Sequence, residues 1–202
     1  MTDGATTTML LIRHARTDAV DGWVAGREAV PLNQVGRAQA ERLRHRLRAV
    51  NIAAVYSSPL DRALETAAGL AHERGLLVEP RLELIEVDFG AWSGVSFDRL
   101  AQDPAWVRFN RQRGLAEVPR GERAPAVQAR IVGAVDELRI RHPNQTIALV
   151  SHADVIRLAV LFAAGTPIDF IHRFEISPAS VTCLEVSEHG ITLKYVNATD
   201  CQ

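Results

Sequence analysis

Two histidines each follow a short apolar run of the chain. Arg13 and His14 come directly after residues 8–12, and His152 follows residues 146–150 after one serine. Short apolar runs are typical of buried parallel strands, and the carboxyl ends of such strands line the ligand crevice of an open α/β sheet. A single histidine would be interpreted as a packed or solvated side chain. A pair at two strand ends predicts instead that both imidazoles lie in one crevice.

A third strand end carries the signals of a helix start together with an arginine. Ser58 is expected to cap this helix, with Pro59 as its first residue and Asp61 in its third position. Arg62 would then lie in the first turn, where free N–H groups, the helix dipole and the guanidinium all favour an anion such as phosphate. The alternative is a surface arginine that pairs with Asp61 or Glu65 on its own helix.

The second histidine also stands at a predicted helix start. Ser151 is expected to act as the N-cap and Asp154 to occupy the third position, which places His152 at the start of the helix. An anion close to His152 would therefore feel the positive end of this helix dipole as well.

Glu86 is the carboxylate in the most apolar part of the sequence, because residues 84–92 are mostly hydrophobic. Burial there would raise the pKa of the carboxyl group and suit it to general acid catalysis near neutral pH. The other interpretation, a buried structural carboxylate or an ordinary loop acid, stays open from the sequence alone.

The elements that must position these residues alternate between strand and helix. Apolar runs predict strands at 8–12, 53–56, 146–150, 181–186 and 191–196, with a weaker one at 76–79. Apolar stripes of helical period predict helices at 35–50 and 126–141. Such alternation predicts an α/β fold.

Residues 88–123 break this alternation, because Gly, Trp, Phe and Arg recur there without a steady period. We expect an excursion of short helices and loops that forms the wall or lid of a site within a single domain of residues 1–202. The candidate wall residues, for which ordinary packing or solvation is the alternative, are Trp92, Phe97, Trp106, Phe109, Arg111 and Arg113.

Composition argues against several classes of partner. The 202 residues are 47% hydrophobic, enough for one compact core, and 23 Lys and Arg balance 24 Asp and Glu. Such a balance gives no overall field that would attract nucleic acid or an anionic membrane.

The two cysteines, Cys183 and Cys201, do not make a disulfide framework or a cysteine zinc site. The apolar run 9–12 is too short for a signal peptide or a membrane span, so we expect a soluble, cytoplasmic protein.

These residues together resemble the histidine phosphatase superfamily, also called the phosphoglycerate mutase-like family, over nearly the whole chain. Residues 11–17 are similar to its Arg-His-Gly signature, and residues 31–40 to the Pro-Leu-Thr-x-x-Gly-x-x-Gln-Ala run that follows. Residues 57–67 are similar to its second-arginine segment, 86–94 to its glutamate-and-glycine segment, and 151–153 to its second-histidine motif. The resemblance implies a three-layer α/β sandwich, with a mostly parallel central sheet and helices on both faces.

The resemblance also implies a phosphatase that hydrolyses the phosphate ester of a small metabolite through a phosphohistidine. It makes His14 the nucleophile and Glu86 the acid that protonates the leaving alcohol. Arg13, Arg62 and His152 would form the phosphate pocket. Neither a metal nor another cofactor is implied, because the guanidinium groups would supply the positive charge. The further substrate contacts that the family pattern implies are Thr17, Gly26 and Arg27.

Three positions depart from the family pattern. Ala15 and Ala153 stand where the family most often has glycine, and Val20 stands where many relatives carry asparagine. If either alanine backbone required a positive φ or a close approach to phosphate, the methyl group would cost about 1 kcal/mol. Val20 would remove one neutral donor, so we expect Asp18 or Arg16 to reshape that side of the pocket.

Three other functions fit parts of the pattern. A cofactor-dependent phosphoglycerate mutase would usually carry a longer insertion near the lid, and the two alanines suggest a non-catalytic phosphate-binding regulatory module. A metal-dependent hydrolase would use His14, His152, Glu86 and Asp88, but neither histidine has the short-range partner of a zinc motif.

The oligomeric state stays open, because the last strand could pair in a homodimer or be blunted as an edge by Lys194.

Overall fold

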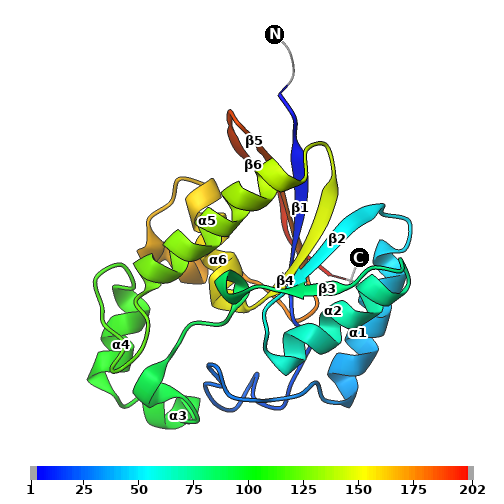
Figure 1. The fold of residues 1–202 in the computed structure, drawn as a ribbon. Helices are drawn as coiled ribbons and strands as arrows, with labels where there is room; N and C mark the ends of the chain where they lie inside the picture. Colours follow the sequence, from blue (N-terminus) through cyan, green and yellow to red (C-terminus); the bar gives the residue numbers. More distant parts are fainter. Residues whose placement is uncertain (1–3, 200–202) are drawn as a thin grey trace.

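Six strands form one sheet in the computed structural model, which describes residues 4–199 (Figure 1). The strand order is β3-β2-β4-β1-β5-β6, and neighbouring strands are parallel except at β5, which is antiparallel to β1 and β6. Each predicted strand is present, with ends that differ by no more than two residues. The bounds are β1 Thr7–Arg13, β2 Ile52–Ser57, β3 Val78–Pro80, β4 Thr146–Ser151, β5 Val181–Ser187 and β6 Gly190–Ala198.

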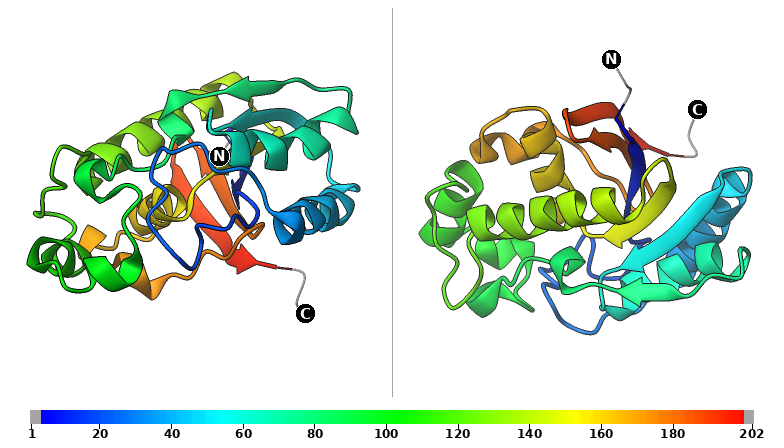
Figure 2. Two further views of the ribbon diagram at one scale, coloured as in Figure 1. Left: turned by 90° about the horizontal axis from the view of Figure 1, so that it is seen from below. Right: turned by 45° about the horizontal axis from the view of Figure 1, so that its top comes forward.

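Helices cover both faces of this sheet, as Figures 1 and 2 show. One face carries α1 (Gln34–Leu47) and α2 (Asp61–His72), and the other carries α5 (Ala124–Arg141) and α6 (Ala153–Ala163). The predicted three-layer α/β sandwich is therefore confirmed, and the two predicted helices are present as α1 and α5. The shorter elements are α3 (Phe97–Leu100), α4 (Pro104–Arg111) and the 3-10 helices η1 (Leu82–Leu84), η2 (Gly90–Trp92) and η3 (Ile168–Arg173).

Alternate residues of the central strands belong to two separate cores. Met9 and Leu11 of β1 pack in the core on the α5 and α6 face, whereas Leu10 and Ile12 pack in the core on the α1 and α2 face. Side chains divide in this way because successive residues of a strand point to opposite faces of the sheet. Since both faces are buried, β1 is a continuous apolar run rather than an alternation of apolar and polar residues.

Both helix starts at the crevice lie later in the chain than predicted. The N-cap of α2 is Leu60 rather than Ser58, and the N-cap of α6 is His152 rather than Ser151. Both serine hydroxyls make tertiary contacts, and Ser58 Oγ also accepts from the Leu60 N–H at 3.3 Å. Ser58 Oγ lies 2.7 Å from His152 Nε2, and Ser151 Oγ donates to the carbonyl oxygen of Leu84 at 2.7 Å. The capping prediction was wrong because the sequence does not reveal these long-range partners.

The start of α1 is locked to the loop that follows β1. Asn33 caps the helix by accepting a hydrogen bond from the Gly36 N–H at 2.9 Å, and the Asn33 N–H donates to Arg16 O at 3.2 Å. A Cβ atom on Gly36 would lie 2.0 Å from Arg16 O, so this position has room only for glycine. The close approach holds the loop downstream of His14 against α1.

Residues 88–123 form the predicted excursion from the sheet, on the side of the molecule away from α1 and α2 (Figure 1). Phe89, Trp92, Trp106 and Phe109 pack together there, with ring centroids 5.2–6.1 Å apart. The indole N–H of Trp92 donates to Asp103 at 3.0 Å. This packing makes a firm wall, and the action of the excursion as a lid stays a prediction.

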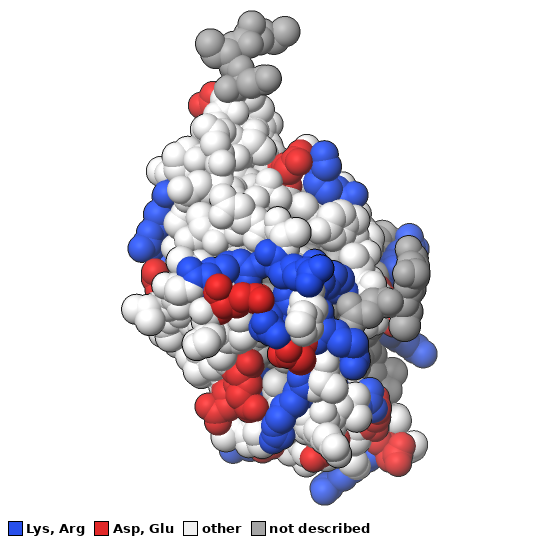
Figure 3. All heavy atoms as spheres, turned by 90° about the vertical axis from the view of Figure 1, so that its right-hand side faces the viewer, with Lys and Arg blue, Asp and Glu red and all other residues white. Residues whose placement is uncertain are grey.

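Charged side chains of both signs share the surface. Figure 3 shows the side at the right of Figure 1, where a band of basic side chains is bordered by acidic ones. Ion pairs include Arg44 with Glu73 at 2.7 Å.

Among residues 4–199, no helix combines the length and the apolar character that a membrane span requires. Cys183 is buried in β5, and Cys201 lies outside the described residues.

Candidate active site

The ends of three parallel strands bring the predicted catalytic side chains together. In the register of β1 and β4, Arg13 lies opposite Ser151, and the His14 N–H donates to Ser151 O at 2.9 Å. The residues that follow these strand ends, His14 and His152, therefore stand at the same level. Their ring centroids are 5.1 Å apart. The Ser58 N–H, at the end of β2, donates to Val150 O at 2.9 Å and completes this edge.

His14 is held as a neutral imidazole, and its Nε2 has no hydrogen-bond partner among residues 4–199. Nδ1 lies 2.7 Å from Ala15 O, which can only accept, so Nδ1 carries the proton and Nε2 keeps its lone pair. The side chain is buried, and burial, with the charges of Arg13 and Arg62, lowers the pKa of His14 well below its ordinary value. A neutral imidazole with an unprotonated, unpartnered nitrogen is the form that attacks phosphorus.

Arg62 is fixed from the first turn of α2 by backbone carbonyls. Its Nη1 donates to Glu28 O at 3.0 Å and its Nη2 to Gly26 O at 2.6 Å. Gly26 has a φ of +51°, and a Cβ there would lie 2.7 Å from Ser93 Oγ. This glycine backbone therefore determines where the guanidinium points. Arg62 is buried, and burial lowers its pKa, yet it remains a cation because the ordinary value is so high.

Arg13 supplies a second buried cation beside the histidines. Its Nη1 donates to Ile176 O at 2.6 Å, and its Nε has no hydrogen-bond partner among residues 4–199. Burial, with the charge of Arg157, lowers the pKa of Arg13 to about 10, so the guanidinium is still charged at neutral pH. An unpartnered donor on a buried cation is what a bound oxyanion would satisfy.

Glu86 is the buried acid that the sequence predicted. Its Oε1 accepts from the Val87 N–H at 2.9 Å, and its side chain is 14% exposed. Burial and the nearby carboxylate of Asp154 raise the pKa of Glu86 to about 7. A carboxyl group with this pKa holds its proton near neutral pH and can still release it, as a general acid must.

The backbone of Glu86 is clamped by two arginines. The carbonyl oxygen of Glu86 accepts from Arg27 Nε at 3.1 Å and from Arg130 Nη2, on α5, at 3.4 Å. Glu122 pairs with both arginines, at 3.0 Å from each. The clamp fixes the carboxyl group relative to the two histidines without touching its acidic oxygens.

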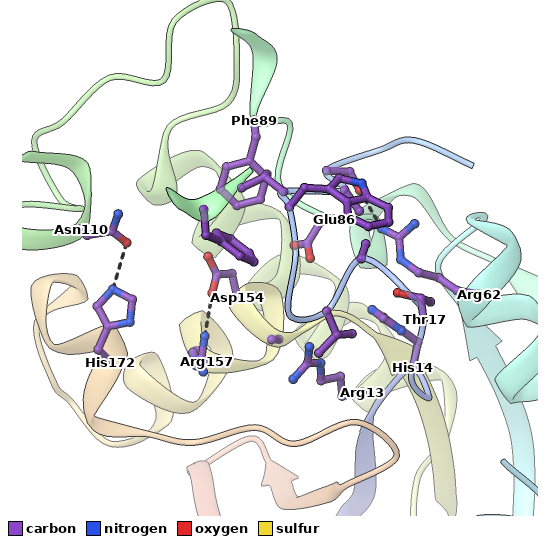
Figure 4. Close-up of a pocket in the computed structure, with 18 of the residues that line it drawn as sticks. Arg13, His14, Thr17, Arg62, Glu86, Phe89, Asn110, Asp154, Arg157 and His172 are labelled. Carbon is purple, nitrogen blue, oxygen red and sulfur yellow. Dashed lines mark hydrogen bonds and ion pairs between the residues drawn. The ribbon is translucent and has the colours of Figure 1, made fainter. Parts of the chain in front are cut away.

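A cavity of about 350 Å³ opens over these side chains. Figure 4 shows Arg13, His14 and Arg62 toward one end of it, with Glu86 beside them. Two predicted contacts do not line it, because His152 is fully buried beside His14 and the Arg27 side chain is used in the clamp. The predicted site residues that do line it are Arg13, His14, Thr17, Gly26, Arg62 and Glu86.

The family model for the histidine phosphatase superfamily (branch 1) matches residues 9–199. The chain belongs to the histidine phosphatase superfamily. Among solved structures it is similar to YhfR of Bacillus stearothermophilus, with 33% identity, a TM-score of 0.88, and coverage of 93% of this chain and 95% of that one. The prediction of the family and of its fold is thus confirmed.

Two curated relatives illustrate the range of this superfamily. Phosphoserine phosphatase 1 of Hydrogenobacter thermophilus is 28% identical over 95% of this chain and 92% of its own length. The bifunctional protein Rv2228c of Mycobacterium tuberculosis is 32% identical over 97% of this chain. The chain spans 55% of the length of that mycobacterial protein, about half. The phosphatase name of the first relative agrees with the predicted class of enzyme.

The two alanines that replace the superfamily's usual glycines cause no backbone strain. Neither Ala15 nor Ala153 has a positive φ, so glycine is not required at either position. The Ala15 N–H donates to Thr66 Oγ1 at 3.0 Å, which ties the residue after the nucleophile to α2. The cost that a positive φ would impose is therefore absent.

The third departure changes the lining of the cavity. Val20 lines it, as the sequence predicted for the position of the missing asparagine. Arg16 and Asp18 do not replace that donor, because Arg16 pairs with Asp21 and Asp18 accepts from Asn33 at 2.9 Å. The expected reshaping by Arg16 or Asp18 is wrong, and this side of the cavity is apolar.

The excursion supplies only part of the predicted wall. Phe97, Trp106 and Arg113 line the cavity, whereas Trp92 and Phe109 are buried in the aromatic cluster behind it. Arg111, the sixth candidate, is exposed and does not line the cavity. A half-buried indole that sequence analysis did not single out, Trp23, lines the cavity from the loop after β1.

The groups considered as metal ligands are used in other ways. Asp88 accepts from the Gly90 N–H at 2.9 Å and lies 3.7 Å from Arg27, and it does not line the cavity. Within residues 4–199, no three His, Cys, Asp or Glu side chains come together as metal ligands would.

A polar cluster that was not predicted from the sequence lines the cavity on the side away from Arg62. Figure 4 shows its members Asn110, Asp154, Arg157 and His172, and Arg113 lines the cavity as well. Of its members only Arg113 was predicted as a wall residue, and the one further signal was the spacing of Asp154 and Arg157 along one helix. Their partners come from α4, the turn after it and η3, which only the tertiary structure brings together.

Proposed function

We propose that this protein is a phosphoric monoester hydrolase that acts on a small phosphorylated metabolite through a phosphohistidine on His14. Two neighbouring groups carry the proposal. His14 is neutral and its Nε2 can attack, and the carboxyl group of Glu86 has a pKa of about 7. One group has the lone pair and the other has the proton that phosphoryl transfer to histidine requires.

In the first step, the lone pair of His14 Nε2 attacks phosphorus and the bond from phosphorus to the alcohol oxygen breaks. Glu86 gives its proton to that oxygen, so that an alcohol leaves rather than an alkoxide. Arg13 and Arg62 stabilise the charge on the phosphoryl oxygens during transfer. The His14 ring, now cationic, keeps its Nδ1–H on Ala15 O and is held in place by that contact.

In the second step, water attacks the phosphohistidine from the side that the alcohol has left. Glu86, now a carboxylate, takes a proton from the water as the new oxygen–phosphorus bond forms. The phosphorus–nitrogen bond breaks and its electron pair returns to Nε2. Phosphate leaves, and both groups regain their starting protonation states.

Hydrolysis fits this chain better than a mutase cycle. A mutase must keep its substrate while a phosphoryl group moves between two oxygens, which favours a long closing insertion. The excursion here is short, and its wall is held by packed aromatic rings. The name of the Hydrogenobacter relative, a phosphoserine phosphatase, also supports hydrolysis.

The test is phosphate release from a panel of phosphate monoesters, with chelator present, by the wild-type protein, His14→Ala and His189→Ala. His189 is exposed and serves as the control. We expect His14→Ala to lower kcat by about 10³-fold or more and His189→Ala to have no effect. Mass spectrometry after rapid quenching should find a phosphoryl group on His14. Hydrolysis that survives in His14→Ala would contradict the phosphohistidine route, and isomerisation of 3-phosphoglycerate that is faster than phosphate release would favour the mutase.

A further inference from the structure

A buried ion cluster stands in the wall of the same cavity, next to the group of Arg13, His14 and Arg62. Arg113 Nη1 lies 2.6 Å from Asp154 Oδ2, and Arg157 Nη1 lies 3.0 Å from Asp154 Oδ1. The Arg113 side chain is 3% exposed, and its guanidinium carbon stacks 4.0 Å from the centre of the Phe109 ring. These contacts fix both guanidinium groups in a wall that any bound substrate must face.

The cluster carries one positive charge in excess. The two oxygens of Asp154 are each occupied by one guanidinium, and these two charges hold the pKa of Asp154 well below its usual range. Two cations and one anion leave a net charge of +1 in a poorly hydrated place. Arg113 Nε is also buried and has no hydrogen-bond partner within the described chain. A buried donor and an uncompensated charge together fit an anionic group of the ligand.

The next residues in the wall add polarity but no charge. Asn110 Oδ1 accepts from Arg113 Nη2 at 3.0 Å, and it lies 3.1 Å from His172 Nε2 (Figure 4). An oxygen acceptor at that distance places the proton of His172 on Nε2 and leaves Nδ1 as an acceptor. Partial burial, with the charge of Arg113, lowers the pKa of His172 and keeps the ring neutral at pH 7.

This second cationic site lies beside the phosphate pocket. Arg157 Nε donates to Phe174 O at 2.9 Å, and Arg13 Nη1 donates to Ile176 O at 2.6 Å. The two carbonyls are two residues apart, so no more than about 7 Å of chain separates the anchors of the two guanidinium groups. The charge of Arg157 also lowers the pKa of Arg13, which agrees with a short separation of the two guanidinium groups. We therefore expect a substrate that reaches both sites to carry its second anionic group close to its phosphate.

We infer that Arg113 and Arg157 form a carboxylate subsite, and that the substrate is the phosphate ester of a short hydroxy acid. The inference rests on the proposed function, because it takes the phosphate to be bound at His14. A carboxylate matches the single excess charge of the cluster. A second phosphate would bring about two negative charges close to Asp154 and would leave one of them unpaired.

The first test measures binding apart from turnover. Calorimetric titrations of His14→Ala compare 3-phosphoglycerate with glycerol 3-phosphate, which has a hydroxymethyl group in place of the carboxylate. We expect 3-phosphoglycerate to bind about tenfold more tightly or better, which is the usual effect of a charge-assisted hydrogen bond. Equal affinities for the two ligands would overturn the inference.

The second test assigns the preference to the proposed residues. Arg157→Met is compared with Arg111→Met, whose side chain is exposed on the nearby helix α4 and does not line the cavity. We expect Arg157→Met to raise KM for 3-phosphoglycerate about tenfold, with little change for glycerol 3-phosphate, and Arg111→Met to change neither. Equal losses on both esters would show a structural role and would overturn the assignment. If Arg157→Met does not fold, Arg157→Gln serves in the same comparison.

Failure of this inference is distinguishable from failure of the proposed function. A protein that hydrolyses both esters at equal kcat/KM retains the phosphatase activity and lacks the carboxylate subsite. A protein that binds 3-phosphoglycerate preferentially without releasing phosphate retains the subsite and lacks the phosphatase activity.

Discussion

Nδ1 of His152 lies 3.8 Å from Oε2 of Glu86, and it has no hydrogen-bond partner in the part of the chain that the structure describes. The other ring nitrogen is 2.7 Å from Ser58 Oγ, so the ring is fixed on one side only. Burial of an unpartnered ring nitrogen costs free energy unless a ligand supplies the partner. A phosphoryl oxygen that reached this nitrogen would do so. The place of His152 in the phosphate pocket stays a prediction, because the side chain is fully buried and does not line the cavity.

Glu86→Gln should separate substrates by their leaving groups. The amide cannot protonate the departing oxygen, so we expect kcat/KM for alkyl phosphates, which reports the steps up to release of the alcohol, to fall about 10²–10⁴-fold. For 4-nitrophenyl phosphate, whose phenolate leaves without a proton, the loss in kcat/KM should be below about tenfold, whereas kcat should fall for both esters because Glu86 also activates the water. The matched control is Glu117→Gln, an exposed glutamate outside the cavity. Equal losses in kcat/KM on both esters would show that Glu86 positions the substrate rather than protonating the leaving group.

The pH dependence of kcat/KM should show a decline above neutrality. The active enzyme has an unprotonated His14 and a protonated Glu86, and burial lowers the pKa of His14 while it raises that of Glu86 to about 7. We therefore expect kcat/KM to fall about tenfold per pH unit above pH 7, as Glu86 loses its proton. The ionisation of the substrate phosphate, near pH 6, must be divided out. A decline that persists in Glu86→Gln would belong to another group.

The same carboxyl group should lower the stability of the protein at alkaline pH. The pKa of Glu86 rises from 4.5 to about 7 on folding, so the folded state binds more protons than the unfolded state between these values. Stability from this group is complete below pH 4.5 and is lost as the pH rises through 7. We expect Glu86→Gln to raise the free energy of unfolding at pH 8 by on the order of 2 kcal/mol, with little change at pH 5.

Urea denaturation of wild type and Glu86→Gln at the two pH values measures this effect. A difference between the two proteins is informative because both contain the two buried histidines, whose lowered pKa values act in the opposite direction at acid pH. If Glu86→Gln raised the free energy of unfolding equally at pH 5 and pH 8, burial would not raise the pKa of the Glu86 carboxyl group.

Two glycine substitutions should have opposite effects. Gly26→Ala adds a Cβ 2.7 Å from Ser93 Oγ at a φ of +51°, so we expect a loss of about 1–3 kcal/mol in the free energy of unfolding. Gly133 lies inside α5 with nothing within 4 Å of its added Cβ among the described residues, and Gly133→Ala should stabilise by about 0.5–1 kcal/mol.

Only the first of these glycines should matter for activity. Gly26 O accepts from Arg62 Nη2, so a displaced loop moves a phosphate-binding guanidinium. We expect Gly26→Ala to lower kcat/KM by about tenfold at temperatures where it is fully folded, and Gly133→Ala to leave it unchanged. Unchanged activity in folded Gly26→Ala would show that Arg62 does not depend on this backbone contact.

The apolar runs and motifs of the chain were sufficient to predict the sheet and the residues at its crevice. Apolar runs are sufficient to mark buried strands, because a strand that is covered on both faces needs hydrophobic residues at every position. Once the strands are known, the parallel arrangement places His14 and His152 at one edge. The apolar surroundings of Glu86 likewise predicted a raised pKa, because burial always disfavours the charged form of a carboxyl group.

The polar partners of these residues, in contrast, became known from the folded chain alone. The hydroxyls of Ser58 and Ser151 are committed to His152 and Leu84 rather than to helix caps, and Arg27 is used to hold the Glu86 backbone. The cluster that joins Arg113 to Asp154 and Arg157 was likewise hidden, because its members come from different elements. Hydrophobic burial follows local periodicity, whereas a hydrogen bond between distant residues depends on where folding places both of them.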